Sequence, residues 1–420
     1  MKDFNPIESF ADMTHEFGEH GGVNMSIETS TTFTVMHADT LPDIFLGRKG
    51  PEEGGCFLYG RHFNPTVYVL GKQIAAIEGA EAGYCTASGM GAISSTVMQL
   101  CGHGDHVVSS DTIYGGTFAL FRDYLPAKTG IDVSFVDMSD RAAVESAITP
   151  RTKVVYVESI SNPTLRVADI PYLAELAHSH GAKLVVDNTF SPLILSPLKL
   201  GADIVVHSLT KFINGASDYI GGAICASSEF ITELMDLHLG SLMLLGPALD
   251  PRAAFAISMR LPHLGLRMVE HSRRAQTFAE RLHEAGLSVT YPGLADHPDH
   301  ELLERLRRPE YGCGGILCLD LGDQRRAHEF MEILQNKDRF GFMAVSLGYF
   351  ETLMSCSSST TSSELTEEEQ RSANIRPGLV RMSIGYTGTL EQRWSQLRDA
   401  LEILNLMETE VAGESVGSVN

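Results

Sequence analysis

The sequence predicts an α/β protein with a mostly parallel sheet. Several short runs rich in β-branched residues are apolar almost throughout, as strands buried on both faces are. Segments with helical periodicity lie between these runs, which is typical of strands joined by helical crossovers. The chain has 420 residues. Because a single core stops growing at about 250–300 residues, we expect a second packed unit as well.

The first part of the chain is expected to be an arm followed by a large domain. Residues 1–63 lack sustained periodicity and are rich in Gly, Thr, Glu and His, so we expect an irregular arm that serves oligomer contacts. Residues 64–260 carry the alternating pattern and are expected to form the large domain. Its expected strands are 105–111, 132–138, 152–159, 182–190, 202–208 and 219–226. Its clearest helices are expected at 140–148 and 169–181.

The pattern changes after about residue 255 to that of a smaller α+β domain, which we place at 261–420. A long helix is expected at 267–286, with strands at 314–322 and 379–386. Two further helices are expected at 326–336 and 390–404, and the polar end of the chain, 408–420, is expected to fray.

Composition excludes several classes of function. The formal charge of −21 opposes attraction to nucleic acid or anionic lipid. No run approaches the ~18 apolar residues of a membrane span, and the first residues lack the apolar core of a secretory signal. The seven cysteines show no C-x-x-C spacing, which favours reduced thiols in the cytoplasm. The histidines of "HEFGEH" lie five residues apart, not four, so no zinc site is expected.

Polar residues stand where the apolar runs end. The carboxyl ends of parallel strands share one edge of the sheet, and ligands bind there. We therefore expect a carboxylate, a lysine, hydroxyl groups, an aromatic ring and a helix start to meet at one crevice. These residues are Asp187, Lys211, Ser208, Thr210, Tyr114, Ser88, Gly89 and Met90.

Pyridoxal phosphate (PLP) needs such a set of groups. Its aldehyde requires a lysine amine, its ring nitrogen a carboxylate, and its phosphate the N–H groups of a helix start. A helix start contributes only about 0.3–2 kcal/mol to anion binding, so further donors such as Ser208 and Thr210 are expected beside it. Lys211 would bind the aldehyde of PLP, and Asp187 would contact its ring nitrogen.

One rival interpretation is a dinucleotide-binding site. The run "GMGAIS" approximates G-x-G-x-x-G, and Asp111 follows about twenty residues later. This interpretation requires a glycine where Ser94 stands, and it gives no reason for the pair of Asp187 and Lys211. A visible absorbance band that borohydride removes would separate PLP binding from this alternative.

Five stretches make the chain similar to a known family. They are "SGMGAISS", "DTIYGGTF", "ESISNPT", "VVDNTFSPLILSPLKLGADIVVHSLTKFINGASD" and "GLVRMSIGY". Over roughly residues 15–407, the chain resembles the Cys/Met-metabolism family of PLP enzymes. The resemblance implies the PLP-dependent transferase-like fold (fold type I), with a seven-stranded, mostly parallel sheet in the large domain.

The resemblance also implies roles for individual residues. Lys211 matches the Schiff-base lysine, Asp187 the partner of the pyridine nitrogen, and Tyr114 the ring-stacking tyrosine and acid for the leaving thiolate. Asn162 matches a contact to the cofactor's phenolic oxygen. The residues that match phosphate ligands are Ser88, Gly89, Met90, Ser208 and Thr210.

Two further matches concern the neighbouring subunit and the substrate. Tyr59 and Arg61, from "YGR", match residues that reach into the phosphate site of the adjacent subunit. This implies an obligate homodimer, commonly doubled to a tetramer. Arg381 matches the arginine that clamps the substrate carboxylate, with Ser346 nearby.

Within the family, four stretches make the chain most similar to plant-type methionine γ-lyases: "HEFGEHGGVNMSIE", "YGRHFNPTV", "GSLMLLGP" and "FMAVSLGYFETLMSCSSS". The implied reaction is α,γ-elimination on a small sulfur amino acid, which from methionine gives methanethiol, 2-oxobutanoate and ammonia. Gly116 stands where many bacterial methionine γ-lyases carry a cysteine, and the usual histidine near "TLMSCSSS" is absent.

Three alternatives remain at this point. The first two are a cystathionine γ-lyase and a γ-replacement transferase, such as a cystathionine γ-synthase or an O-acylhomoserine sulfhydrylase. The third is a scaffold that keeps the fold without the reaction.

Overall fold

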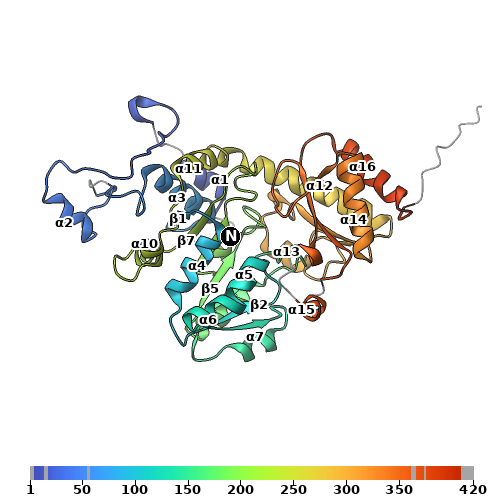
Figure 1. Ribbon diagram of the computed structural model, residues 1–420, viewed down its shortest axis with the longest axis horizontal. Helices are drawn as coiled ribbons and strands as arrows, with labels where there is room; N and C mark the ends of the chain where they lie inside the picture. Colours follow the sequence, from blue (N-terminus) through green and yellow to red (C-terminus); the bar gives the residue numbers. More distant parts are fainter. Residues whose placement is uncertain (1–3, 14–17, 54–56, 361–365, 373–374, 408–420) are drawn as a thin grey trace, which may run out of the picture.

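The computed structural model describes residues 4–13, 18–53, 57–360, 366–372 and 375–407. In these residues the strands form two sheets, a seven-stranded one with the order β1-β7-β6-β5-β4-β2-β3 and a five-stranded one with the order β10-β11-β12-β9-β8. The segment that carries helix α2 lies at one end of the molecule and helix α16 at the other (Figure 1). The predicted α/β fold is confirmed.

The large sheet is mostly parallel, as predicted. Strands β3, β2, β4, β5 and β6 pair in parallel, whereas β7 pairs antiparallel with both β6 and β1. The sequence pattern missed β1. The strands are β1 (Ala82–Thr86), β2 (His106–Ser110), β3 (Asp132–Val136), β4 (Thr152–Glu158), β5 (Lys183–Asp187), β6 (Ile204–Ser208) and β7 (Gly222–Ala226).

Helices cover both faces of this sheet, which explains why its strands are apolar throughout. Along β4, Val154 and Tyr156 belong to one core cluster, while Val155 and Val157 belong to another on the opposite face. Helices α4 (Gly89–Leu100), α5 (Gly115–Ala119), α9 (Ser228–Leu234) and α10 (Ser241–Leu245) contribute to the first cluster. Helices α7 (Arg141–Ala147) and α8 (Ile170–Ser179) contribute to the second.

Three more helices complete this part of the chain: α3 (Pro65–Glu78), α6 (Leu125–Thr129) and α11 (Pro251–Ser258). Helix α3 has clear signals at both ends. The Asn64 side chain accepts hydrogen bonds from the first-turn N–H groups of Thr66 and Val67, and Gly79 ends the helix in a left-handed conformation.

The C-terminal part combines the smaller sheet with the long helix α12 (Leu264–Glu284). The strands predicted at 314–322 and 379–386 are confirmed as β9 (Ile316–Asp320) and β12 (Leu379–Ser383). The other strands are β8 (Ser288–Thr290), β10 (Gly341–Met343) and β11 (Thr352–Cys356). The other helices are α13 (His300–Leu306), α14 (Gln324–Glu332), α15 (Glu367–Ser372) and α16 (Leu390–Ile403).

The arm is less irregular than expected. It contains α1 (Pro6–Asp12), whose Phe10 is buried in the main core, and α2 (Thr40–Phe45). Residues 18–53 extend away from the large sheet (Figure 1), and Val23 and Met36 are each 91% exposed there. The boundaries at 1–63, 64–260 and 261–420 stay predictions, and the tail 408–420 lies outside the described residues.

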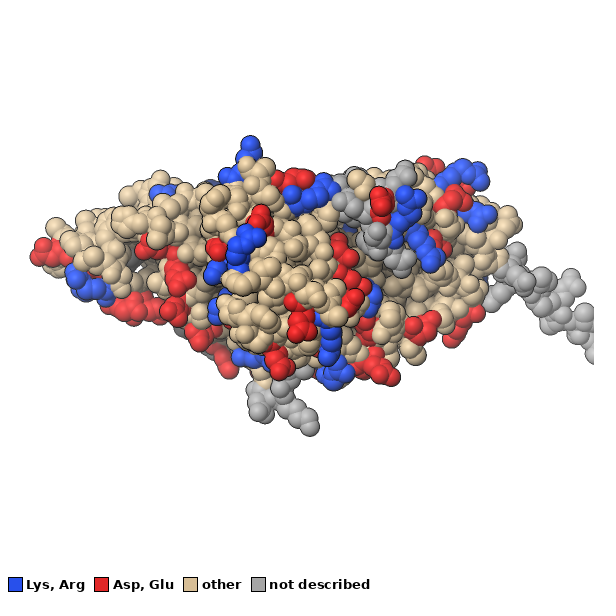
Figure 2. All heavy atoms as spheres, turned by 90° about the horizontal axis from the view of Figure 1, so that it is seen from below, with Lys and Arg blue, Asp and Glu red and all other residues tan. Residues whose placement is uncertain are grey.

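The distribution of surface charge and the apolarity of the helices bear on whether the protein binds nucleic acid or a membrane. Acidic side chains are spread over the face drawn in Figure 2, with basic ones between them. No helix in the described part of the chain is both long and apolar enough to cross a membrane.

Candidate active site

A cavity of about 230 Å³ lies at the carboxyl edge of the large sheet. Strands β4, β5 and β6 run parallel and end there, while β12 approaches from the smaller sheet. The structure brings most of the predicted site residues together around this cavity. Those lining it are Ser88, Gly89, Met90, Tyr114, Asn162, Asp187, Ser208, Thr210, Lys211 and Arg381.

Lys211 follows β6 in a tight turn. The Lys211 N–H donates to the Ser208 carbonyl at 3.3 Å, and the guanidinium of Arg267 holds the turn by donating to the Ile213 carbonyl at 2.9 Å. The Lys211 Nζ donates to Ser346 Oγ at 3.1 Å. Burial, and secondly the charge of Arg381, lower the pKa of Lys211 to about 8. The neutral form of this amine is therefore a minority near physiological pH, but a far larger one than for an ordinary lysine.

Gly348 brings Ser346 close to the lysine. Its φ is 76°, and a Cβ on it would lie 2.4 Å from the backbone N of Phe212, which follows Lys211. Only glycine allows the loop to pack this closely against the lysine turn. The Gly348 N–H donates to Ser383 Oγ at 2.8 Å and so fixes the loop to β12.

Asp187 ends β5 and is 8% exposed. Its Oδ1 accepts from the Thr189 N–H at 2.9 Å, and its Oδ2 accepts a longer bond from the Tyr156 hydroxyl at 3.4 Å. Burial raises the pKa of Asp187 above its usual value. In the described part of the chain no cation pairs with this carboxylate. A protonated ring nitrogen would supply the missing partner.

The start of α4 forms an anion-binding site beside Lys211. The Ser88 Oγ caps the helix by accepting from the Gly91 N–H at 3.0 Å. A Cβ on Gly89 would lie 2.9 Å from Ser208 Cβ, so the glycine lets the helix start lie against the end of β6. The first-turn N–H groups of such a helix attract phosphate. Thr210 also lines the cavity, although its hydroxyl already bonds to the backbone of Gly221.

Arg381 approaches the cavity from the middle of β12 and is 3% exposed. Its Nη1 donates to Asn162 Oδ1 at 2.9 Å, and its Nη2 donates to the Ser346 carbonyl at 3.2 Å. Burial lowers the pKa of Arg381. The guanidinium is therefore fixed in place, as a receptor for a carboxylate requires.

Glu158 is a site residue that the sequence interpretation missed. It ends β4, is 6% exposed, and accepts from the Tyr114 N–H at 2.7 Å and the Asn162 N–H at 2.8 Å. Burial, and then the charge of Asp187, raise the pKa of Glu158 to about 8. The rule that identified Asp187, a polar residue at the end of an apolar run, also applies to Glu158. Other missed lining residues are Ile93, Ile160, Thr189, Phe190, Ile220, Val345 and Leu347.

Tyr59 and Arg61 do not line the cavity of their own chain. The Tyr59 side chain is 44% exposed, and the Arg61 guanidinium carbon lies 5.8 Å from the centre of its ring. Arg61 also donates a hydrogen bond to the Met243 carbonyl. Tyr114 lies at the cavity and is 46% exposed.

The donor set of the cavity fits PLP. An amine with a lowered pKa, a buried carboxylate without a cation and a helix start lie around one space, which matches the aldehyde, ring nitrogen and phosphate. Residues 10–401 match the family described as "Cys/Met metabolism PLP-dependent enzyme". The chain belongs to this family. PLP is therefore its cofactor.

Relatives within the Cys/Met family include several methionine γ-lyases. The chain is 56% identical over 399 residues to a methionine γ-lyase from Arabidopsis thaliana, covering 95% of this chain and 90% of the relative. It is 39% identical over 370 residues to an L-methionine γ-lyase from Fusobacterium nucleatum subsp. polymorphum, covering 87% of this chain and 90% of the relative. The chain is thus an enzyme of a PLP-dependent lyase family.

Solved structures of the family share this fold. A putative O-acetylhomoserine (thiol)-lyase from Campylobacter jejuni, solved with a pyridoxyl-lysine monophosphate, matches with a TM-score of 0.86 and 28% identity over 95% of this chain and 100% of its own. A cystathionine γ-synthase from Xanthomonas oryzae pv. oryzae matches with a TM-score of 0.85 and 32% identity over 95% of this chain and 98% of its own. The fold type I architecture is confirmed.

Proposed function

We propose that the protein is a methionine γ-lyase, which converts L-methionine to methanethiol, 2-oxobutanoate and ammonia. The observation that carries the proposal is the meeting of Lys211, Asp187, the α4 start and Arg381 at one cavity. The 56% identity to the Arabidopsis methionine γ-lyase over 95% of the chain supports the choice of substrate.

The cofactor would be held by Lys211, by Asp187 at the ring nitrogen and by the α4 start with Ser208 and Thr210 at the phosphate. When bound, PLP supplies an electron sink for the carbanion that forms at the substrate's α-carbon. Lys211 Nζ takes the α-proton, and its lowered pKa of about 8 keeps a neutral fraction available near neutral pH.

Other residues of the chain orient the substrate. Arg381 binds the substrate carboxylate bidentately, and Asn162 and Ser346 hold the guanidinium for that contact. Asn162 would also contact the cofactor's phenolic oxygen. Tyr114, whose backbone N–H is fixed by Glu158, would stack on the cofactor ring, and its hydroxyl would give a proton to the departing sulfur.

The test compares Lys211→Ala with Lys153→Ala, which removes an exposed lysine of β4. The unmodified protein and Lys153→Ala should show a visible band that borohydride removes and should form methanethiol and 2-oxobutanoate from L-methionine alone. Lys211→Ala should show neither. Substantial elimination by Lys211→Ala would refute the role of the lysine.

A γ-replacement transferase is the second candidate, and the catalytic set would be the same. An O-succinylhomoserine sulfhydrylase from Pseudomonas aeruginosa is 40% identical over 372 residues, which supports keeping this candidate. Turnover that requires both an activated homoserine and a thiol would favour it over the lyase. A cystathionine γ-lyase, represented by the Bacillus subtilis relative at 38% identity over 371 residues, would prefer cystathionine to methionine.

We further propose a cytoplasmic homotetramer, built as a dimer of dimers, in which Tyr59 and Arg61 complete the phosphate site of the adjacent subunit. Exposed apolar side chains on the arm and α10, such as Met36 and Leu245, support burial against another copy. The described cysteines are unpaired and buried, in keeping with a reducing compartment. They are Cys85, Cys101, Cys225, Cys313, Cys318 and Cys356.

A further inference from the structure

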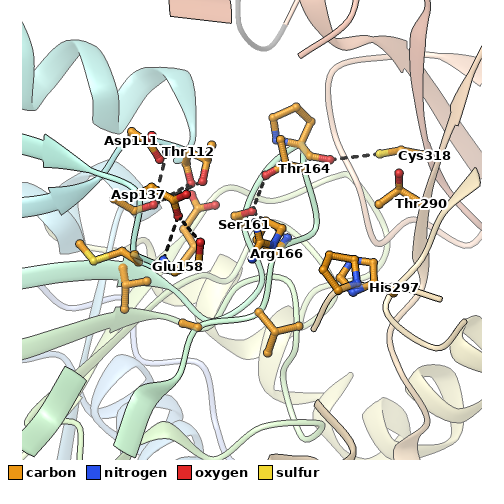
Figure 3. A pocket seen from close by; sticks show the side chains of 18 of the residues that line it. Asp111, Thr112, Asp137, Glu158, Ser161, Thr164, Arg166, Thr290, His297 and Cys318 are labelled. Atoms are coloured by element: carbon orange, nitrogen blue, oxygen red, sulfur yellow. Dashed lines mark hydrogen bonds between the residues drawn. The ribbon is translucent and has the colours of Figure 1, made fainter. Parts of the chain in front are cut away.

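The carboxyl edge of the large sheet borders two cavities. The candidate active site lies where β4, β5 and β6 end, and a second cavity, of about 280 Å³, lies where β2, β3 and β4 end. Figure 3 shows Asp111 and Asp137, which follow β2 and β3, beside Glu158, which ends β4. Side chains that border a cavity have fewer packing contacts, so the position of this edge depends on what lies behind it.

Buried polar side chains lie behind the residues of the active site. Asp187 and Ser208 line the cavity, whereas their chain neighbours Asn188 and His207 do not line it and are buried. Neighbouring residues of an extended chain point to opposite faces. The Asn188 N–H donates to the Val206 carbonyl at 3.0 Å and so ends the backbone ladder between β5 and β6. Beyond this bond, side chains join the two strand ends.

One carboxylate connects these buried side chains. Glu78, the last residue of α3, is 1% exposed, and its Oε1 accepts from Asn188 Nδ2 at 3.0 Å and from His207 Nε2 at 2.7 Å. The Asn188 Nδ2 also donates to the Leu195 carbonyl at 3.1 Å, and its Oδ1 accepts from Ser191 Oγ at 2.8 Å. Because all the polar atoms of this amide have partners, its orientation is fixed.

The same group of side chains reaches the end of β4. Ser191 Oγ lies 2.7 Å from Ser159 Oγ, which also lies 3.2 Å from the Asp187 carbonyl. Ser159 follows Glu158 and is fully buried. The ends of β4, β5 and β6 are therefore tied together by side chains that do not line the active-site cavity.

Stability alone does not account for a carboxylate at this position. Glu78 Oε2 and His207 Nδ1 are buried and have no hydrogen-bond partner among the described residues. Burying a carboxylate and an imidazole costs free energy that well-packed apolar side chains of similar size would not cost. The pair also acts on the active site, because burial raises the pKa of Asp187 and the charge of His207 opposes that rise.

We propose that Glu78 is a positioning residue for the cofactor. Through Asn188 and His207, it sets the distance between the ends of β5 and β6. Asp187 stands at the first end and Ser208 at the second. PLP has to reach Asp187 with its ring nitrogen and Ser208 with its phosphate, and the span between these two groups is fixed. A shift between the strand ends therefore weakens one of the two contacts. The inference rests on the cofactor contacts proposed above and not on the reaction.

The test compares PLP binding by the cofactor-free forms of the unmodified protein, Glu78→Met and Glu78→Gln. Methionine fills the space but accepts neither hydrogen bond, so the dissociation constant, measured by fluorescence titration, should rise about tenfold or more. The glutamine oxygen accepts two hydrogen bonds without a charge. Glu78→Gln should therefore bind PLP within about threefold of the unmodified protein.

Gln73→Met is the matched control, because it breaks a buried hydrogen bond of the same helix. Gln73 Oε1 accepts from Ser258 Oγ at 2.6 Å, and neither residue lines the active site. Denaturant unfolding should show a similar loss of stability in Glu78→Met and Gln73→Met, whereas only Glu78→Met should lose PLP affinity. Unchanged PLP affinity in Glu78→Met, an equal loss in Gln73→Met, or an equal loss in Glu78→Gln would overturn the proposal.

Two further variants keep the test decisive. If Glu78→Met does not fold, Asn188→Ala, which cuts the bridge on the β5 side, takes its place with the same expected loss of PLP affinity. Asp187→Ala separates the bridge from the cofactor contact. If Asp187→Ala binds PLP as tightly as the unmodified protein, the proposed contact is refuted and the inference with it. If Asp187→Ala loses affinity and Glu78→Met does not, only the bridge is refuted.

Discussion

At the scale of single residues, Lys211 shows how the site adjusts an ordinary side chain to its task. The amine lies near Arg381 and is partly buried, and its bond to Ser346 does not offset the cost of its charge. Its pKa of about 8 places the change from charged to neutral amine close to working pH.

This pKa predicts how cofactor uptake depends on pH. Only a neutral amine attacks the aldehyde, so uptake of PLP by the cofactor-free protein should speed up as pH rises through about 8 and then level off. Stopped-flow absorbance of the visible band measures the rate. A rate that keeps rising toward pH 10.5, the usual value for lysine, would contradict the lowered pKa.

Gly116 provides a second prediction for a single residue. A Cβ there would lie 2.6 Å from Cε1 of the Tyr114 ring, so Gly116→Ala should displace that ring. Because misplacing a reacting group by about 1 Å can cost 10²-fold in rate, we expect elimination to fall about tenfold or more. The free energy of unfolding should change by less than about 1 kcal/mol, since the ring is exposed and free to move.

The matched control is Gly265→Ala, whose nearest neighbour would lie at an ordinary 3.6 Å. Steady-state kinetics and denaturant unfolding of both variants separate the two effects. Full activity in Gly116→Ala would show that the ring position does not limit the reaction.

The sequence predicted the residues whose signal is local. Lys211 and Asp187 were found because each follows an apolar run, and Arg381 through a family motif. Glu158 was missed although it ends an apolar run in the same way. Its contacts with the backbone of Tyr114 and Asn162 depend on a turn that no periodicity indicates.

At the scale of elements, the start of α4 and the end of β6 act as a pair. Gly89 lets the two approach, and the atoms it would contact, Ser208 Cα and Cβ, belong to a rigid strand end. The helix start and Ser208 can therefore face one phosphate together.

Gly89→Ala should move the start of α4 away from β6. A Cβ at 2.9 Å from Ser208 Cβ cannot be accommodated without this shift, so PLP affinity should fall about tenfold or more through weaker phosphate contacts. Gly102→Ala, at the other end of the helix, would meet its nearest neighbour at 3.7 Å and should bind PLP normally. Fluorescence titration of the cofactor-free variants gives the dissociation constants. Equal affinities would mean that α4 does not hold the phosphate.

Helices and strands were predicted correctly where the hydrophobic periodicity was sustained. The prediction failed for a strand whose partner lies far away in the sequence. The runs that form β2 to β7 and the long helix α12 were predicted within a few residues. The run "AGYCT" of β1 is short and poor in β-branched residues, and it pairs with β7, far along the sequence. Neither the antiparallel placement of β7 nor that of β1 has a local signature.

At the scale of the whole molecule, the position of Tyr59 and Arg61 leads to a mixing experiment. If the two side chains complete a neighbouring site, Arg61→Ala and Lys211→Ala subunits are each inactive alone, because each lacks one part of every site. A hybrid dimer keeps one intact site. Random pairing of equal amounts should therefore restore about a quarter of the unmodified activity.

Co-expression of the two variants, followed by assay of methanethiol formation, measures this recovery. Lys211→Ala mixed with Lys211→Ala carrying a different tag is the control and should stay inactive. Mixed protein that is no more active than its components would place Arg61 in its own chain's site or outside the site altogether.

The bonds that hold Arg381 have a consequence for substrate binding. Flexible side chains usually lose rotamer freedom when they capture a ligand, at a cost of about 0.5–1.5 kcal/mol each. Arg381 has already lost that freedom, because Asn162 and the Ser346 carbonyl fix its guanidinium before any substrate arrives. The entropy is spent once, when the chain folds, and not again in each catalytic cycle.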